Sequence, residues 1–328
     1  QRRRRQRPPT ATEWPTASRC YRLPGNHDRI GQSQNTEGRS GMEIGIGLPA
    51  TIPGMHGRRI IEWARRADAG PFSSLGIIDR IVYPNHEPLV TLAAAAGATE
   101  RIRLMTTVLV APARDPVYLA KQAATIDSLS NGRLTLGLGV GGREDDFLAV
   151  GASFHGRGKR LEEQLAIMQR VRNGEAPYDD VGPVGPPPVQ AGGPPILLGG
   201  YSPAAVNRLA RWGVGFISAG GDPSSVSRLF EMARKAWAAG GRSGSPRLVG
   251  SIYCAVAPDD PERARAYIRH YYAFLGPGGD AMANAIPTTA DAIRRAIDGY
   301  AAAGADEVVL WPCLPDLDQV DRFAEIVG

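Results

Sequence analysis

Short apolar runs and amphipathic segments alternate from Met42 to the end of the chain. The apolar runs, rich in β-branched and aliphatic residues, predict eight strands, over residues 44–48, 74–79, 102–110, 133–140, 195–198, 214–218, 247–256 and 307–311. Between the strands, apolar residues at helical spacing and polar residues placed before Pro predict helices over residues 58–69, 88–98, 116–129, 158–171, 203–212, 223–239, 259–275, 289–303 and 316–327.

This alternation predicts the fold class. Strands separated by helices pair in parallel through crossover connections. Eight such units between Met42 and Gly328 favour a closed α/β barrel of the (β/α)8, or TIM, type over an open doubly wound sheet. We expect irregular insertions after the fourth and seventh strands. Loops 143–157, 173–195 and 276–288 are the expected walls of a substrate pocket.

In a barrel of this type, the functional groups gather at the carboxyl ends of the strands. We therefore expect the functional residues among those at or directly after the end of a predicted strand. They are Pro49 and residues 79–80, 106–110, 139–143, 199–201, 218–221 and 311–313.

Residues 137–142 match the G-x-G-x-x-G fingerprint of dinucleotide-binding turns, with Glu162 twenty residues further on. Glu144, Asp145 and Asp146 follow directly, and carboxylates at a helix start repel a pyrophosphate. Three strand–helix units also precede this segment, whereas the fingerprint opens its domain. We therefore interpret the glycines as strand positions that leave room for a ligand or a close backbone.

The stretch from Asp115 to Gly142, DPVYLAKQAATIDSLSNGRLTLGLGVGG, strongly resembles the bacterial luciferase-like monooxygenase family. Further segments are similar to the same family: TERIRLMTT at 99–107, FHGR at 154–157, RLEEQ at 160–164, PILLGGYSPAA at 195–205, GFI at 215–217 and AAAGADEVV at 301–309. The resemblance covers roughly residues 42–328.

The resemblance implies a luciferase-like barrel that binds FMN, or alternatively the deazaflavin coenzyme F-420, at the carboxyl rim. Members with FMN use O2 and accept reduced flavin from a separate reductase, members with F-420 transfer a hydride, and many are homodimers. Met105–Val108 corresponds to the family's cofactor-positioning third strand. The implied cofactor-binding residues are Thr106, Thr107, Val108, Gly139, Gly141, Gly142, Gly199, Gly200, Tyr201, Ser202 and Gly220.

The chemistry of these positions is compatible with a flavin. A planar ring system needs apolar walls and a few backbone donors. Thr106, Thr107 and Val108 supply a β-branched wall with hydroxyls, and the strand-four glycines permit a close ring approach. Residues 199–202, placed before a Pro-initiated helix, offer free amides to a terminal phosphate. Gly220 offers a second set of amides, although the adjacent Asp222 is a better helix cap than a phosphate neighbour.

The catalytic candidates are Asp79, Arg80, His86 and His155. Many relatives carry an acid followed by His at the end of strand two, where this chain has Asp79-Arg80, so light-producing chemistry is not expected. Asp79 is assigned to the flavin edge or the substrate, or else to a cap or an ion pair with Arg80. Arg80 is assigned to an anionic flavin or peroxide, or else to solvated charge.

Loop histidines are suited to acid–base work but are also common polar surface groups. His86 and His155 are open to both readings, and His56 is a weaker candidate of the same kind. Glu144 and Asp146 are open to contacts with ribityl hydroxyls or substrate, or to a simple role at a solvated helix start. No metal-ligand spacing is present.

Charge changes the picture of the N-terminus. The formal net charge is +5, but residues 1–41 carry nine Arg against three acids, so the remainder has a net charge of −1. Residues 1–41 lack apolar periodicity and predict a disordered basic extension. A nucleic-acid partner would rest on this segment alone and is not expected. The body, 42–328, is predicted to be one flavin-dependent domain.

Composition adds limits on compartment and partners. Cys20, Cys254 and Cys313 are too scattered for a disulfide framework or a zinc site, which favours a cytoplasmic protein. No apolar run approaches about 18 residues, so no membrane span or partner is expected.

The sequence thus predicts an enzyme, a monooxygenase using reduced FMN and O2 on a small organic molecule. The alternatives are an F-420-dependent hydride-transfer enzyme and, from another class, a non-catalytic flavin-binding protein. A phosphate-sugar barrel enzyme is disfavoured because strand ends lack its catalytic Lys, Glu or metal ligands.

Overall fold

The computed structural model describes residues 41–218 and 220–328. Residues 42–328 form one compact unit, and the basic extension predicted at the N-terminus lies, apart from Gly41, outside the described residues. No helix among the described residues is long and apolar enough to span a membrane.

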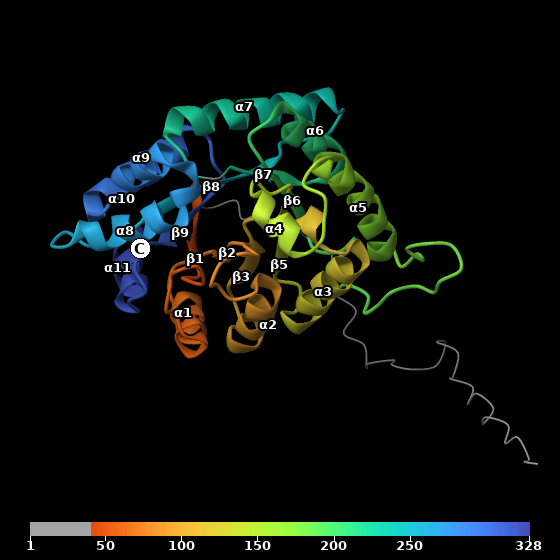
Figure 1. Cartoon of the computed structure of the whole chain (residues 1–328), viewed down its shortest axis with the longest axis horizontal. Coiled ribbons are helices and arrows are strands. Elements are labelled where there is room, and N and C mark those ends of the chain that lie inside the picture. Colours follow the sequence, from red (N-terminus) through yellow and green to blue (C-terminus); the bar gives the residue numbers. More distant parts are fainter. Residues whose placement is uncertain (1–40, 219) are drawn as a thin grey trace, which may run out of the picture. The chain divides into compact units, whose positions relative to one another are not determined.

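The core of this unit is a closed barrel of parallel strands, seen along its axis in Figure 1. The strands are β1 (Glu43–Gly47), β2 (Ser74–Ile77), β3 (Arg103–Thr106), β4 (Leu109–Val110), β5 (Leu134–Gly139), β6 (Ile196–Gly199), β7 (Gly215–Ile217), β8 (Arg247–Cys254) and β9 (Glu307–Pro312). The order runs from β3 through β2, β1, β9, β8, β7 and β6 to β5, and the β3–β5 pairing closes the ring. The predicted (β/α)8 barrel is confirmed.

Most helices surround the ring on its outside, whereas α4 is drawn over the middle of the ring in Figure 1. The helices are α1 (Gly57–Ala69), α2 (Pro88–Ala98), α3 (Pro116–Leu129), α4 (Glu144–Ala149), α5 (Arg157–Arg172), α6 (Pro203–Trp212), α7 (Pro223–Ala239), α8 (Pro261–Tyr271), α9 (Pro277–Ala285), α10 (Ala290–Ala302) and α11 (Asp318–Val327), with short 3-10 turns η1 (Ala111–Ala113) and η2 (Ala273–Leu275). Asp115, Ser202 and Asp222 each accept backbone hydrogen bonds at a helix start, as predicted from the Pro that follows each of them.

The third barrel strand is broken, which corrects the single strand predicted over 102–110. β3 ends at Thr106 and β4 begins at Leu109, with a cis peptide bond between Thr107 and Val108. At the break, the Thr106 hydroxyl donates to the Gly137 carbonyl and accepts from the Gly137 amide, both at 2.8 Å. The side chain thus connects the two strands where the backbone ladder is interrupted.

Other predicted boundaries also need correction. The second strand ends at Ile77 rather than at 79, and the seventh barrel strand ends at Cys254 rather than at 256. The expected loop 143–157 contains α4, which buries Phe147. The expected loop 276–288 contains α9, where Gly279 packs so tightly that a Cβ there would lie 2.5 Å from the Tyr272 carbonyl oxygen. Both helices are short and depend on tertiary contacts, which periodicity does not reveal.

The barrel interior is filled by one apolar cluster, Met105, Leu197, Ile217, Val249, Val309 and Trp311. Trp311 is the largest member, and two glycines of neighbouring strands make room for it. A Cβ at Gly47 would lie 2.2 Å from the indole ring, and a Cβ at Gly76 would lie 3.1 Å from it. The interior is therefore a packed core, and space for a ligand lies above it, at the rim.

At the amino end of the barrel, Glu307 is fully buried yet charged groups surround it. Its carboxylate accepts hydrogen bonds from the hydroxyls of Ser73 and Ser74 and pairs with Arg103 and Arg247. These charges and hydroxyls outweigh the effect of burial, which alone would raise its pKa, and hold the pKa of Glu307 below its usual value. This cluster joins the four strands β2, β3, β8 and β9 at the end of the barrel opposite the rim.

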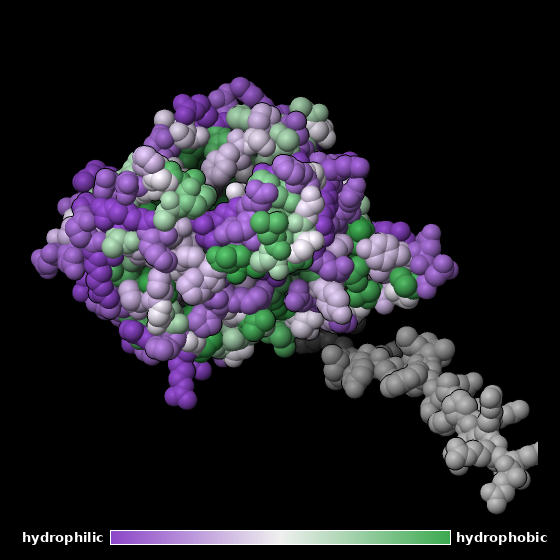
Figure 2. Space-filling view, viewed as in Figure 1, coloured by the Kyte–Doolittle hydropathy of each residue, from purple (hydrophilic) through white to green (hydrophobic). Residues whose placement is uncertain are grey.

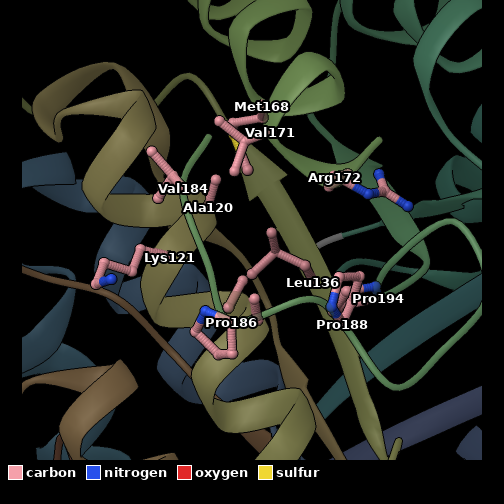
Figure 3. Close-up of a pocket in the computed structure, with 12 residues that line it drawn as sticks. Ala120, Lys121, Leu136, Met168, Val171, Arg172, Val184, Pro186, Pro188 and Pro194 are labelled. Carbon is pink, nitrogen blue, oxygen red and sulfur yellow. The ribbon is translucent and has the colours of Figure 1, made fainter. Parts of the chain in front are cut away.

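The insertion after β5 includes the extended segment 173–195, which lies over α3 and α5. The buried carboxylate of Asp127 on α3 accepts from the backbone amides of Val189 and Gln190 at 2.8 and 3.0 Å and from the Gln190 side chain at 2.6 Å. Beneath the segment is a small apolar cavity of about 10 Å³, from which the charged ends of Lys121 and Arg172 point away (Figure 3). The segment is therefore fixed by a buried acid.

Candidate active site

Three loops meet above the carboxyl end of the barrel. The loops after β2 and β5 flank the broken third strand, whereas β8 lies on the opposite side of the ring. The insertion after β8 nevertheless brings Tyr271 against Tyr83 of the β2 loop, with ring centroids 5.1 Å apart, and against Arg143 of the β5 loop, whose guanidinium donates to the Tyr271 carbonyl at 2.7 Å. The β8 insertion therefore spans the barrel mouth.

Asp79 is buried, and its carboxylate is fully engaged. It accepts from the Val110 amide at 2.9 Å and from the Arg114 guanidinium at 2.9 and 3.0 Å. Burial raises the pKa of Asp79, against the opposing charge of Arg114. Arg114 also pairs with Glu87 at 2.8 Å. The predicted ion pair of Asp79 with Arg80 is wrong, because Arg114 takes that place and ties β4 to the β2 loop.

Arg80 points to a different partner. Its side chain is buried and its Nε lies 3.3 Å from a carboxylate oxygen of Asp146 on α4. Asp146 also accepts from the amides of Ile81 and Val82 at 3.0 and 2.7 Å. The guanidinium lies over the Tyr83 ring at 5.1 Å and the Tyr271 ring at 5.6 Å. The alternative prediction that Arg80 is a solvated surface charge is wrong. Asp146, likewise, is a buried ion-pair partner and not a solvated residue at a helix start.

The rim is rich in tyrosines that sequence reasoning missed. Tyr253 of β8 and Tyr272 share a hydrogen bond of 3.0 Å, and the Tyr267 hydroxyl lies 2.6 Å from that of Thr51. Burial raises the pKa of all three phenols, so they stay protonated at neutral pH. The aromatic-rich run YIRHYYAF at 267–274 is the sequence signal that could have predicted these tyrosines. Figure 2 shows this face, with hydrophobic side chains over α4, where Leu148 and Val150 are exposed.

The predicted cofactor wall is arranged around Val108. Thr107 and Val108 are half-buried, whereas Thr106 is completely buried and its hydroxyl serves Gly137. A Cβ at Gly139 would lie 2.6 Å from a Val108 methyl group, and a Cβ at Gly199 would lie 2.9 Å from the other. These two glycines thus make room for the Val108 side chain. The Thr106 hydroxyl is thus bonded to Gly137 rather than directed at a cofactor. The space expected to be open at Gly139 is filled by the Val108 side chain.

The other predicted cofactor positions lie along the rim from β5 to β7. Gly141 has a φ of +70°, and nothing lies within 4 Å of a Cβ at Gly142. Gly200 packs against α6, while Tyr201 and Ser202 are exposed at its start. Gly220 lies beside β8, where a Cβ would be 3.2 Å from the Ser251 carbonyl oxygen. Ser218, at the end of β7, is fully buried, and its hydroxyl has no hydrogen-bond partner among the described residues.

The predicted histidines do not converge. His86 is half-buried beside Gly57, His155 is exposed next to Phe154, and His56 is exposed before α1 with no side-chain cap bond. A fourth, His270 on α8, shares a 2.8 Å hydrogen bond with the Tyr83 hydroxyl and was missed. Among the residues that the structure describes, no group of three or more His, Cys, Asp or Glu is placed to hold a metal ion.

Eight parallel strand–helix units with tyrosines and arginines gathered at the carboxyl rim define a (β/α)8-barrel protein with its candidate site at the barrel mouth. The family model described as luciferase-like monooxygenase matches residues 35–313. The chain belongs to this family.

The chain is also similar to curated proteins of mycobacteria. An uncharacterised protein of Mycobacterium bovis is 30% identical over 202 residues, covering 53% of this chain and 70% of the relative. A phthiodiolone/phenolphthiodiolone dimycocerosates ketoreductase of Mycobacterium bovis is 29% identical over 274 residues, covering 74% of this chain and 71% of the relative.

Among solved structures, monooxygenase RslO1 from Streptomyces bottropensis has a TM-score of 0.68 at 22% identity, covering 87% of this chain and 97% of that chain. An F420-dependent secondary alcohol dehydrogenase in complex with an F420-acetone adduct has a TM-score of 0.71 at 18% identity, covering 87% and 98%. The oxygenating constituent of a Baeyer-Villiger monooxygenase from Pseudomonas putida, in complex with FMN, has a TM-score of 0.65 at 18% identity, covering 87% and 96%. At these identities the likeness shows the fold.

Proposed function

We propose that this protein is a flavin-dependent monooxygenase that uses reduced FMN and O2 on a small organic substrate. The observation that carries the proposal is an apolar floor at the barrel mouth. Ile78, Val108 and Tyr253 are half-buried and pack on the interior cluster below them. A planar ring system is accommodated by such a floor, because ligand sites are mostly apolar with few placed polar groups. Reduced FMN would supply the electrons that activate O2.

The chain's own residues fit a phosphate-bearing cofactor in two places. Gly199–Ser202 precede α6, and the first amides of a helix favour an anion. The Ser218 hydroxyl, at the next strand end, is buried and has no hydrogen-bond partner among the described residues, so it is available to donate to a cofactor oxygen. We assign the terminal phosphate to Gly199–Ser202 and leave Ser218 as a second polar contact to the cofactor.

The remaining rim residues bind, orient and exclude water. Tyr253 and Tyr272 keep their phenolic protons and offer donors above the floor. Arg80 and Arg143 place positive charge at the mouth. Asp79 acts as a positioning residue for β4 through Val110 and Arg114. We assign no proton transfer to His155, because its side chain is exposed and lies next to Phe154 at the outer end of the β5 loop.

A second candidate is hydride transfer with coenzyme F-420. It is favoured by the F420-dependent dehydrogenase among the structural neighbours and by the ketoreductase among the relatives. The same floor and phosphate position serve a deazaflavin. The first candidate requires a separate flavin reductase and the second does not, and a homodimer in the cytoplasm is expected for either.

Titration of the full chain with FMN, reduced FMN and F-420, followed by absorbance and fluorescence, distinguishes these candidates. We expect saturable binding of reduced FMN and, with a flavin reductase added, oxygen consumption that depends on substrate. Binding of F-420 with none for either FMN state favours hydride transfer. Binding without turnover favours a flavin-binding protein, and the absence of any flavin binding contradicts both enzyme proposals.

A further inference from the structure

Two arginines, the buried Arg80 and the half-buried Arg143, lie near one buried carboxylate, that of Asp146, at the barrel mouth. Arg80 is only 8% exposed, and Asp146 is the one carboxylate within 4 Å of its guanidinium among the described residues. The Asp146 carboxylate is shared with the amides of Ile81 and Val82. The Nη1 of Arg80 is buried and has no hydrogen-bond partner in the described part of the chain. An unpartnered buried guanidinium nitrogen is costly and calls for an acceptor.

Arg143 adds a second guanidinium beside the first. It lies 3.5 Å over the Phe274 ring and 5.5 Å from the Tyr271 ring, and its one side-chain hydrogen bond in the described residues goes to the Tyr271 carbonyl. Burial, followed by the like charge of Arg80, lowers the pKa of Arg143. Glu144 and Asp145 are the acids next to it, and both are exposed at the start of α4. Among the described residues, Asp146 therefore forms an ion pair with Arg80 and none with Arg143.

The walls around this charge are aromatic. Tyr83, Tyr271 and Tyr272 pack edge to face, with ring centroids 5.1 and 4.9 Å apart, and Phe274 extends the row to a partly exposed edge. Such rings accept the face or edge of another planar ring. Guanidinium groups bind a carboxylate through paired donors. The charges of Arg80, Arg143 and Asp146 together give +1, which matches a monoanion better than a dianion.

We propose that Arg80 and Arg143 bind the carboxylate of a planar, aromatic or conjugated acid, so that the substrate class is a carboxylic acid held at the barrel mouth. This inference rests on the proposed function for its chemistry, but binding at the two arginines does not require a cofactor. The competing explanation is structural, with Arg80 holding the β2 loop through the Val82 carbonyl and Arg143 holding the β8 insertion.

The test compares two ligands of the same shape and different charge, cinnamate and cinnamamide, by calorimetry on the full chain. We expect the wild-type protein to favour cinnamate by about tenfold or more, as a charged hydrogen-bond pair does. Arg143→Gln is expected to remove most of that preference. Arg80→Lys keeps a charge beside Asp146 but loses the free Nη1 donor, and we expect it to weaken cinnamate binding severalfold.

The matched control is Arg242→Gln. Arg242 also lies over an aromatic ring, at 4.1 Å from Trp237, and also donates to a carbonyl, that of Ala210 at 3.0 Å, but it lies between α6 and α7. This variant is expected to keep the full preference. Equal binding of the two ligands by the wild type, or an undiminished preference in Arg143→Gln, overturns the proposal.

Flavin titration of the same variants separates this proposal from the proposed function. Flavin binding without any preference for cinnamate contradicts the proposed carboxylate site and leaves the proposed flavin-dependent function standing. A preference for cinnamate without flavin binding supports the carboxylate site and contradicts the flavin-dependent function.

Discussion

Asp79 and Arg80 are adjacent in the chain, yet their charged groups join different parts of the molecule. Asp79 faces the end of β4 and Arg114, whereas Arg80 faces α4 and the β8 insertion. The Asp79 carboxylate is surrounded by donors, whereas one nitrogen of Arg80 has no hydrogen-bond partner within residues 41–218 and 220–328. Adjacent charged residues at one strand end therefore serve unrelated purposes, one in the wall and one at the mouth.

At this residue scale, Asp79→Asn is expected to destabilise the protein. Removing one partner of a buried ion pair leaves Arg114 poorly compensated, and the loss in free energy of unfolding should be about 3 kcal/mol. Urea unfolding of the variant measures it. Arg294→Gln, which breaks the exposed pair with Asp291, is the control and should change stability by less than about 0.5 kcal/mol. Equal unfolding midpoints for wild type and Asp79→Asn would contradict this role.

Glu307 gives a pH dependence whose sign follows from its lowered pKa. Its charged form is stabilised in the folded protein, so its contribution is present above the unfolded pKa, near 4.5, and is lost as the pH falls through the lower folded pKa. Glu307→Gln should therefore cost about 3 kcal/mol at neutral pH and progressively less below pH 4.5. Urea unfolding across this range measures the difference, and a pH-independent cost would refute the assignment.

Sequence reasoning at single positions succeeded where one local rule decides the outcome. Asp115, Ser202 and Asp222 were predicted as helix caps from the Pro that follows each, and the structure confirms them. It failed where the partner is distant in the chain. Nothing near Asp79 in the sequence indicates Arg114, and nothing near Arg80 indicates Asp146, which is 66 positions further on.

At the scale of elements, the broken third strand depends on a glycine. A Cβ at Gly137 would lie 2.0 Å from the Thr106 carbonyl oxygen, which the backbone on either side fixes in place. We expect Gly137→Ala to destabilise the barrel by about 2 kcal/mol or more, because overpacking forces the strands apart. Gly142→Ala is the matched control in the same glycine-rich segment, since nothing lies within 4 Å of its Cβ. Thermal unfolding that ranks the two alike would contradict this account.

Asp127 lies in the stretch 115–142 that carries the family resemblance. Its carboxylate binds the segment 173–195 and does not contact the candidate site. Asp127→Ala should free that segment and speed cleavage by chymotrypsin after Tyr178, which is 48% exposed. Cleavage rates under native conditions measure the effect. Asp145→Ala, at an exposed position on α4, should leave the rate unchanged. An unaltered rate in Asp127→Ala would show that other contacts hold the segment.

The eight strand–helix units were predictable because apolar runs and capping residues repeat with every unit. The helices α4 and α9 were not, because each is short and its buried residues meet partners elsewhere, Phe147 against Phe154 and Gly279 against Tyr272. The break at Thr107-Val108 was equally hidden, since β-branched residues run through it without interruption. The predicted fold located the barrel mouth as the candidate site, but it did not identify the tyrosines that line the mouth.

At the scale of the whole molecule, the +5 net charge is a sum over unlike parts. Residues 42–328 carry a net charge of −1 and form one compact unit. We predict that a chain reduced to residues 42–328 binds flavin as the full chain does. Parallel titrations measure this, and a loss of affinity on truncation would assign residues 1–41 a part in binding.

The β8 insertion leaves and rejoins the barrel at nearly one point. The Ala255 amide donates to the Pro287 carbonyl at 3.2 Å, and the Ala257 amide donates to the Thr288 carbonyl at 3.0 Å. The segment between these two points, which includes Tyr267, Tyr271 and Phe274, contributes no strand to the barrel. Its length and sequence can therefore change while the pairing of the strands is kept, so we expect a change of substrate preference to need changes in this insertion rather than in the barrel.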